Sequence, residues 1–172
     1  MKKQFIFIGI RLEALEAFRI FFDLKYVITT KGSFVEKLCK KKRIKHYLVN
    51  KYNKSKISNI LLKEKECKIL CSAGFPYILP VKILKRFDIK INSHPSMLPK
   101  YKGRSPIKQS YKNNDKKIGV TLHRMIGKVD SGSIIYQNYI IQKNLKLKEI
   151  YNIIFKYLEP FVIITGIQKL KI

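Results

Sequence analysis

The chain has 172 residues, and its 37 Lys and Arg side chains outnumber 11 Asp and Glu, which gives a formal net charge of +26 at pH 7. This length predicts one domain and argues against most multidomain arrangements. Apolar residues make up 46% of the chain, which is enough for a sizeable core and too many for a disordered protein. With 8 glycines and 6 prolines, collagen-like and low-complexity structures are excluded as well.

Short runs rich in β-formers alternate with helical patterns along the chain. The predicted strands cover residues 4–10, 26–30, 46–50, 67–73, 89–92, 117–125 and 132–142. The predicted helices cover residues 12–22, 33–42, 55–65, 80–86, 104–113 and 147–168. Alternating strands and helices form βαβ units, so we expect an α/β fold with an open, mostly parallel, Rossmann-like sheet.

The chain is expected to form a catalytic core over residues 1–142, followed by a helical segment over residues 143–172 of the same domain. That segment carries an apolar cluster of Ile150, Ile153, Ile154, Phe155, Leu158 and Phe161. Such a cluster packs either on the core of the same chain or on a second copy in a homodimer.

Neither a membrane span nor a secretion signal is expected. Charged residues interrupt every apolar run before it reaches the roughly 18–20 residues that a bilayer requires. The run at residues 4–10 follows two lysines, as in a signal peptide, but Arg11 and Glu13 end it and no small-residue cleavage site follows. We therefore expect a cytoplasmic protein with no membrane partner.

The three cysteines, Cys39, Cys67 and Cys71, are an odd number, which argues against a disulfide framework. No second pair of Cys or His stands at zinc-site spacing from Cys67 and Cys71, so no metal is expected. The dinucleotide-binding glycine fingerprint and the P-loop are both missing from the sequence.

The positive charge admits two interpretations. The lysines are spread along the chain together with many Ile, Asn and Tyr, which is typical of a compositional bias. The densest run, residues 40–43 with Lys45, is either a solvated helix end or a surface that attracts phosphate. Binding of RNA or another polyanion therefore stays open as an alternative.

The clearest chemical pattern follows the predicted strand at residues 89–92. Asn92 and His94 are two residues apart, so their side chains face the same side of an extended chain. Asp130 follows the strand at residues 117–125, and ligands of open α/β sheets bind beyond the carboxyl ends of strands. An amide, an imidazole and a carboxylate suit acyl transfer, because the first two donate to a developing oxyanion and the third orients the imidazole and assists proton transfer. The motif G-x-S-x-G is missing, so the nucleophile would belong to the substrate.

Three stretches of sequence closely resemble the folate-dependent formyltransferases. Their patterns are N-x-H-P-S-L-L-P-x-Y-x-G, G-V-T-x-H and D-x-G, which match residues 92–103, 119–123 and 130–132 with one departure, Met97 for Leu. Residues 74–80 resemble the segment that lines the folate pocket in that family. The resemblance covers roughly residues 4–142.

The resemblance implies 10-formyltetrahydrofolate as the formyl donor and Asn92, His94 and Asp130 as the catalytic trio. It also implies that the turn at residues 126–129 closes over the pterin. The folate contacts that it implies, chiefly through the backbone, are Pro76, Tyr77, Ile78, Leu79, Asn92 and Val129.

For the formyl acceptor, residues 101–106 and 121–125 look most like the enzymes that act on nucleotide-linked amino sugars. The expected reaction is therefore formyl transfer to the primary amine of a dTDP- or UDP-linked amino sugar. Lys102 and Arg104 would bind its diphosphate, and His123 is expected to be structural. The alternatives are a methionyl-tRNA formyltransferase, a glycinamide ribonucleotide formyltransferase and a non-catalytic RNA- or polyanion-binding relative. About 30 residues follow the last motif strand, too few for the further domain that the resemblance associates with methionyl-tRNA enzymes.

Overall fold

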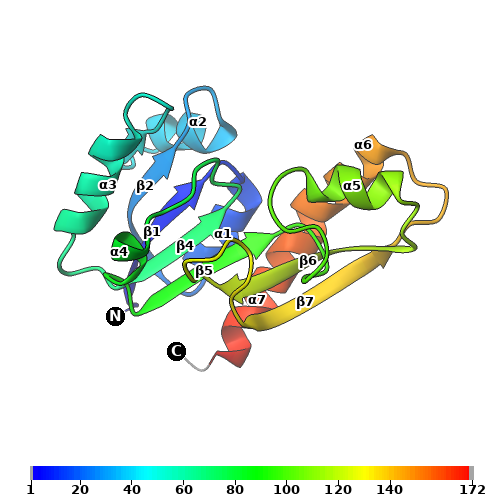
Figure 1. Cartoon of the computed structure of the whole chain (residues 1–172). Helices are drawn as coiled ribbons and strands as arrows, with labels where there is room; N and C mark the ends of the chain where they lie inside the picture. The colour runs from blue at the N-terminus through cyan, green and yellow to red at the C-terminus, as the bar shows by residue number, and fades with distance from the viewer. Residues whose placement is uncertain (1, 171–172) are drawn as a thin grey trace. The chain divides into compact units, whose positions relative to one another are not determined.

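A computed structural model describes residues 2–170 of the chain. Its seven strands follow the order β3-β2-β1-β4-β5-β6-β7 in a mostly parallel sheet, which confirms the expected Rossmann-like α/β fold (Figure 1). The chain divides into two compact units, Met1–Ile91 and Asn92–Ile172. The predicted boundary after residue 142 does not coincide with this division and stays a prediction.

The first unit contains four complete strands and four helices. The strands are β1 Gln4–Gly9, β2 Asp23–Thr29, β3 His46–Leu48 and β4 Ile69–Ala73, and β5 begins at Ile89 and ends at His94. The helices are α1 Leu12–Arg19, α2 Phe34–Lys41, α3 Lys54–Lys63 and α4 Val81–Leu84. Helices α1 and α2 contact each other, as do α3 and α4, which lie side by side in Figure 1.

Strand β1 is the centre of this unit. It pairs in parallel with β2 on one side and β4 on the other, so it is covered on every side and reads as an unbroken apolar run. Phe5, Phe7 and Phe18 are fully buried there. At the end of β1, a side chain on Gly9 would collide with the Ala73 carbonyl of β4, so only glycine fits at this position.

The second unit contains the end of β5, an antiparallel strand pair and the remaining helices. The pair is β6 Lys117–Arg124 with β7 Ile134–Ile141. The helices are α5 Pro106–Lys112, α6 Leu147–Ile153, the π-helical turn η1 Ile154–Leu158 and α7 Glu159–Lys169. Helix α7 packs on β6 and β7, and the lack of a side chain at Gly166 allows its close approach to Leu122 and Tyr136.

The terminal helical segment therefore packs on its own chain, and the homodimer stays a prediction. The segment is not one uniform helix, because the π turn interrupts it just before Pro160 at the start of α7. Proline has no N–H for the helical hydrogen bond, and its ring displaces the preceding turn, so an irregular turn next to it is expected.

The helical stretch Leu147–Lys169 is long and apolar enough to cross a membrane by length and composition, because an 18-residue window within it has a mean hydropathy of 1.4. Lys156 and Glu159 interrupt this stretch, so it is not an unbroken apolar run, and the expected lack of a membrane span stays a prediction. A core helix passes the same test, and 44% of this window is buried within the fold. The finding is a weak indication of a membrane span, and the buried residues Val162, Ile163 and Ile167 belong to the core.

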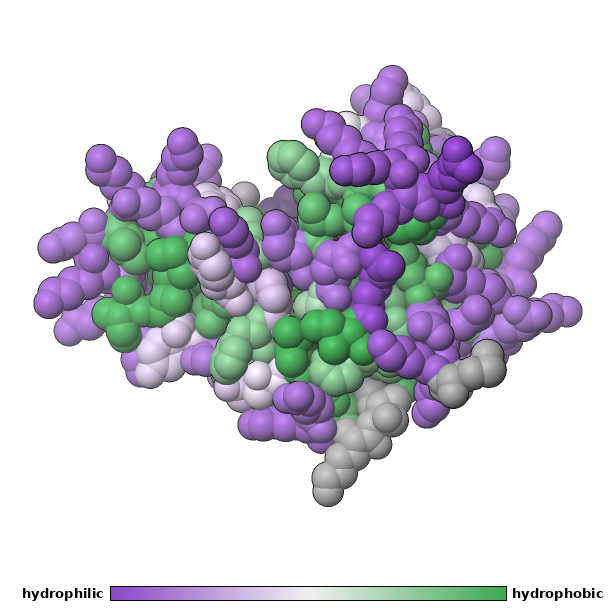
Figure 2. All heavy atoms as spheres, turned by 180° about the vertical axis from the view of Figure 1, so that it is seen from behind, coloured by the Kyte–Doolittle hydropathy of each residue, from purple (hydrophilic) through white to green (hydrophobic). Residues whose placement is uncertain are grey.

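The three cysteines are free and buried. Burial raises the pKa of the Cys39 thiol to about 11 and that of Cys71 well above its ordinary value. Such thiols stay protonated and act as apolar core groups. Hydrophilic side chains project over much of the surface in Figure 2, with apolar groups showing between them.

Candidate active site

The end of strand β5 carries the first two predicted catalytic residues. Asn92 is half-buried and His94 is 5% exposed, and both side chains reach Asp130. Ser93 lies between them, and its side chain points to the opposite face of the strand, as the alternation of an extended chain requires. The predicted trio of Asn92, His94 and Asp130 thus comes together within the second unit.

Asp130 is the centre of the cluster. Its Oδ2 atom lies 3.2 Å from His94 Nδ1 and accepts a hydrogen bond of 2.9 Å from the Gly103 N–H. Its Oδ1 atom lies 3.4 Å from both Asn92 Nδ2 and His123 Nε2. The backbone at Asp130 is left-handed, with φ of 45°, a conformation that aspartate tolerates better than most residues and that is often found at functional sites.

The electrostatic surroundings keep Asp130 ionised. Burial alone raises the pKa of this carboxyl, but three interactions outweigh it: that with His123, whose ring donates to Asp130 when Nε2 carries a proton, the positive charge of His94 and the Gly103 N–H. Together they hold the pKa below its ordinary value of 3.8. Asp130 is therefore a carboxylate near neutral pH, able to orient a ring and accept a proton.

The His94 ring is held from two sides. Its Nε2 atom lies 2.9 Å from the carbonyl oxygen of Tyr101, so Nε2–H donates to that carbonyl. The contact of Nδ1 with Asp130 is then a hydrogen bond when the ring carries both protons. The residue that supplies the carbonyl, Tyr101, has a left-handed φ of 55°.

A second histidine belongs to the cluster. His123 is 2% exposed, and its Nδ1 atom lies 2.9 Å from the Arg124 carbonyl oxygen, so Nδ1 carries a proton. In the neutral ring, Nε2 accepts the hydrogen bond of 3.1 Å from Asn92 Nδ2. The sequence predicts a structural role for His123, whereas the structure places it against two members of the trio. The sequence feature that could have placed His123 in the cluster is its position in the G-V-T-x-H pattern, two residues from the end of predicted strand 117–125.

The loop after His94 is fixed by the other residues of that pattern. The Thr121 hydroxyl donates to the Ser96 carbonyl at 2.7 Å and accepts from the Leu98 N–H at 3.2 Å. A side chain on Gly119 would collide with Met97 of the same loop. Strand β6 therefore shapes the backbone that leads to Tyr101 and Gly103.

The two predicted phosphate-binding residues occupy different positions. Lys102 is exposed, and its Nζ atom donates at 2.9 Å to the Oγ atom of Ser131, the residue after Asp130 in the chain. Arg104 is exposed as well, and its carbonyl accepts a hydrogen bond from Gln109 at 2.6 Å. Lys102 thus lies at the rim of the cluster, while binding of a diphosphate by either residue stays a prediction.

The predicted folate contacts lie mainly in the first unit, in the loop between β4 and α4. Ile78 is 74% exposed there, and the Tyr77 ring packs edge-on against Phe75 at 5.9 Å. Val129, in the loop before Asp130, is 41% exposed. Exposed apolar groups of this kind could cover a flat ring, and their contact with folate stays a prediction. The predicted contacts within this loop, which spans residues 74–80, are Pro76, Tyr77, Ile78 and Leu79.

An α/β sheet whose strand ends hold an amide, two imidazoles and an ionised carboxylate defines a class of proteins suited to acyl-group chemistry. Residues 27–161 match the family described as "Formyl transferase", and the chain belongs to this family.

The chain is similar to methionyl-tRNA formyltransferases over part of their length. It is 42% identical to that of Lactococcus lactis subsp. cremoris (strain SK11) over 78 residues, which cover 45% of this chain and 24% of the relative. It is 34% identical to that of Lactobacillus gasseri over 128 residues, covering 67% of this chain and 40% of the relative. The matched part is thus less than half of either relative.

Among solved structures, the chain is similar to phosphoribosylglycinamide formyltransferase from Streptococcus pneumoniae TIGR4. The TM-score is 0.85 at 19% identity, and all of both chains is covered. At this identity the likeness establishes the fold.

Proposed function

We propose that the chain catalyses transfer of a formyl group from 10-formyltetrahydrofolate to a primary amine. The observation that carries the proposal is the cluster of Asn92, His94 and His123 around the ionised Asp130. The donor, when bound, supplies the formyl group. The residues present fit it, because an amide and an imidazole can both donate to a formyl oxygen.

In this proposal Asn92 donates a hydrogen bond to the formyl oxygen as negative charge develops on it. His94 donates to the same oxygen through its Nε2–H, which exchanges the Tyr101 carbonyl for the formyl oxygen when the donor binds. One such donor is worth roughly 3–4 kcal/mol of transition-state stabilisation. Asp130 holds the His94 ring by its Nδ1 atom, and its carboxylate is the base that accepts the proton that the attacking amine releases. His123 holds the Asn92 amide in the donating orientation.

The acceptor that we favour is methionyl-tRNA, because the relatives of highest identity reported above are methionyl-tRNA formyltransferases. The reported relatives give no support to the expected nucleotide-linked amino sugar. Since the match covers less than half of those relatives, the acceptor is a proposal about this chain alone. The proposal includes the cytoplasmic location expected from the sequence.

The distribution of charge supports a polyanionic acceptor. The 26 residues of segment 31–56 hold ten of the 37 Lys and Arg, and all ten are exposed. The segment holds one acidic residue, Glu36, which is buried and paired with Lys40 at 2.7 Å. This local excess is larger than an even spread of lysine would give. We call this surface, residues 31–56, the basic surface.

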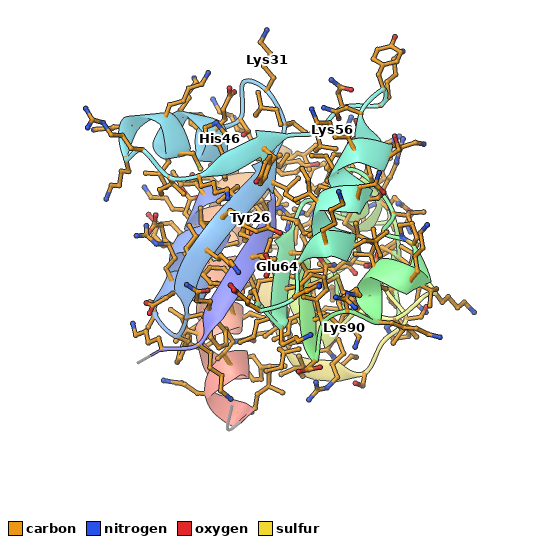
Figure 3. All side chains as sticks on the ribbon, turned by 90° about the vertical axis from the view of Figure 1, so that its left-hand side faces the viewer. Tyr26, Lys31, His46, Lys56, Glu64 and Lys90 are labelled. Carbon is orange, nitrogen blue, oxygen red and sulfur yellow. The ribbon has the colours of Figure 1, made fainter. Side chains whose placement is uncertain are left out.

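Two exposed aromatic rings lie within the basic surface. Phe34 is 70% exposed and Tyr52 is 83% exposed, with the Nζ atoms of Lys37 and Lys51 at 5.2 Å and 4.8 Å from their ring centroids. Figure 3 shows the labelled Lys31, His46 and Lys56 of this segment toward one end of the unit. Cations interleaved with exposed rings are typical of surfaces that bind nucleic acid, because phosphates and bases are bound together.

The test is release of tetrahydrofolate from 10-formyltetrahydrofolate, followed by absorbance with a panel of acceptors. The panel contains charged initiator tRNA, glycinamide ribonucleotide, and dTDP- and UDP-linked amino sugars. We expect turnover with the charged tRNA. Turnover with a sugar alone would contradict methionyl-tRNA as the acceptor and still support formyl transfer. Folded protein that turns over no acceptor of the panel and binds no folate by calorimetry would contradict formyl transfer itself.

A further inference from the structure

A buried pair of side chains lies directly beneath the predicted catalytic residues. The hydroxyl of Ser93, between Asn92 and His94, donates a hydrogen bond of 2.6 Å to Glu159 Oε1. Ser93 is 1% exposed and Glu159 is fully buried. At 2.6 Å this is a short O–H···O hydrogen bond, and it links β5 to the start of α7.

If stability were the only requirement, a glutamate would be an unfavourable residue at position 159. Its neighbours on the buried face of the segment are Leu158, Val162 and Ile163, and an apolar residue would pack there without the cost of removing a carboxyl group from water. The π turn that ends at Leu158, followed by Pro160, sets the helical phase at Glu159. Single π turns inside helices are frequent at functional sites.

The hydrogen bond between Ser93 and Glu159 fixes β5 at Ser93. Because side chains alternate along a strand, a hydrogen bond that fixes Ser93 on one face also fixes the direction of Asn92 and His94 on the other. Both side chains meet Asp130, with His94 at 3.2 Å and Asn92 at 3.4 Å. A catalytic group displaced by about 1 Å can lose roughly 100-fold in rate.

We propose that Ser93 and Glu159 are positioning residues, which hold the end of β5 so that Asn92 and His94 meet Asp130. The expected fall in kcat rests on the proposed formyl transfer. The placement of Asn92 and His94 can be measured without turnover. Glu159 has interactions besides Ser93, so the decisive substitution is made at Ser93.

The test compares Ser93→Ala with Ser110→Ala. Ser110 is a matched control, because it is 3% exposed, lies in the same unit and donates to the carboxylate of Asp115 at 3.1 Å. We expect Ser93→Ala to lower kcat about 10-fold with KM for the folate donor changed less than about twofold. Ser110→Ala is expected to leave kcat within about twofold although it also lowers the Tm.

Two further variants test the bond itself. Glu159→Gln keeps an acceptor oxygen for Ser93 and is expected to retain kcat within about threefold, whereas Glu159→Leu removes it and is expected to resemble Ser93→Ala. Combining Ser93→Ala with Glu159→Leu should lower kcat no further than either change alone, because one interaction is removed twice.

A spectroscopic measurement separates this inference from the proposed function. The imidazole nitrogen resonances of His94 should move in Ser93→Ala and stay in Ser110→Ala, while those of His46 stay in both. If wild-type protein transfers no formyl group, movement of the His94 resonances still supports the positioning role. Unchanged His94 resonances, or wild-type kcat in folded Ser93→Ala, would overturn it. Ser93→Cys, which keeps shape with a weaker donor, serves if Ser93→Ala does not fold.

Discussion

In its neutral form, the ring of His123 accepts a hydrogen bond of 3.1 Å from the side-chain amide of Asn92. This contact decides which way the amide points, because the Nε2 lone pair can only face the NH₂ group and not the amide oxygen. The other ring nitrogen, Nδ1, lies 2.9 Å from the Arg124 carbonyl oxygen. The backbone of β6 therefore fixes the His123 ring, and the ring fixes the Asn92 amide. The proposed oxyanion donor is thereby held ready before substrate arrives.

Substitution of His123 should therefore reduce turnover without removing a group that touches substrate. We expect His123→Ala to lower kcat by about 10- to 100-fold, because the freed amide samples orientations that cannot donate. His46→Ala is the matched control, since His46 makes the same type of contact, from Nδ1 to the Ile44 carbonyl at 2.9 Å, in the other unit. Equal kcat values for the two variants would contradict this role of His123.

Asp130 should make the stability of the protein depend on pH. Its pKa in the folded state lies below the ordinary value of 3.8, so the folded state binds this proton less readily than the unfolded state. The stabilisation is therefore present above about pH 4 and is lost as the pH falls through the folded pKa. We expect the difference in unfolding free energy between wild type and Asp130→Asn to be constant from about pH 5 to 7 and to shrink below pH 4.

Urea unfolding at each pH measures this difference. The exposed Asp88 provides the control, and the difference between wild type and Asp88→Asn should change less over the same range. A difference for Asp130→Asn that grows in acid would reverse the sign argued here. In the assay of formyl transfer, the same variant should lose at least ~100-fold in turnover.

Much of this structure could be predicted from sequence, because the apolar pattern that defines a strand or a helix lies within that element. The run of apolar residues in β1 and the helical spacing in α1 specify their elements without reference to the rest of the chain. The meeting of Asn92, His94 and Asp130 was predictable for a different reason, since the carboxyl ends of parallel strands gather functional groups.

What sequence could not predict depends on contacts between distant segments. The π turn before Pro160 looks like ordinary helix in a periodicity pattern, and nothing local marks Glu159 as the partner of Ser93. His123 alternates with Arg124 along β6, and only the pairing of β6 decides which of the two is buried. The basic surface was obscured because lysine is frequent throughout the chain.

Gly119 of β6 should tolerate no side chain. A methyl group there would collide with the Met97 side chain and the Asn138 carbonyl, and the second of these is backbone that cannot swing aside. We expect Gly119→Ala to lower the free energy of unfolding by about 1–3 kcal/mol. Urea denaturation measures the loss. A variant as stable as wild type would show that β6 and β7 can separate locally without cost.

The basic surface should contribute to binding of tRNA through its charge and its position together. Removing three cations from it, in Lys41→Gln/Lys42→Gln/Lys54→Gln, should weaken binding of initiator tRNA at least ~10-fold at low salt, because each phosphate contact releases counterions on binding. The slope of log affinity against log salt should become shallower by about 2–3.

The control Lys108→Gln/Lys112→Gln/Lys148→Gln removes the same charge from exposed positions of the second unit. Fluorescence anisotropy at several salt concentrations distinguishes the two variants. Equal losses in both would mean that net charge alone attracts the nucleic acid, and that the excess of cations at residues 31–56 has no part in placing it.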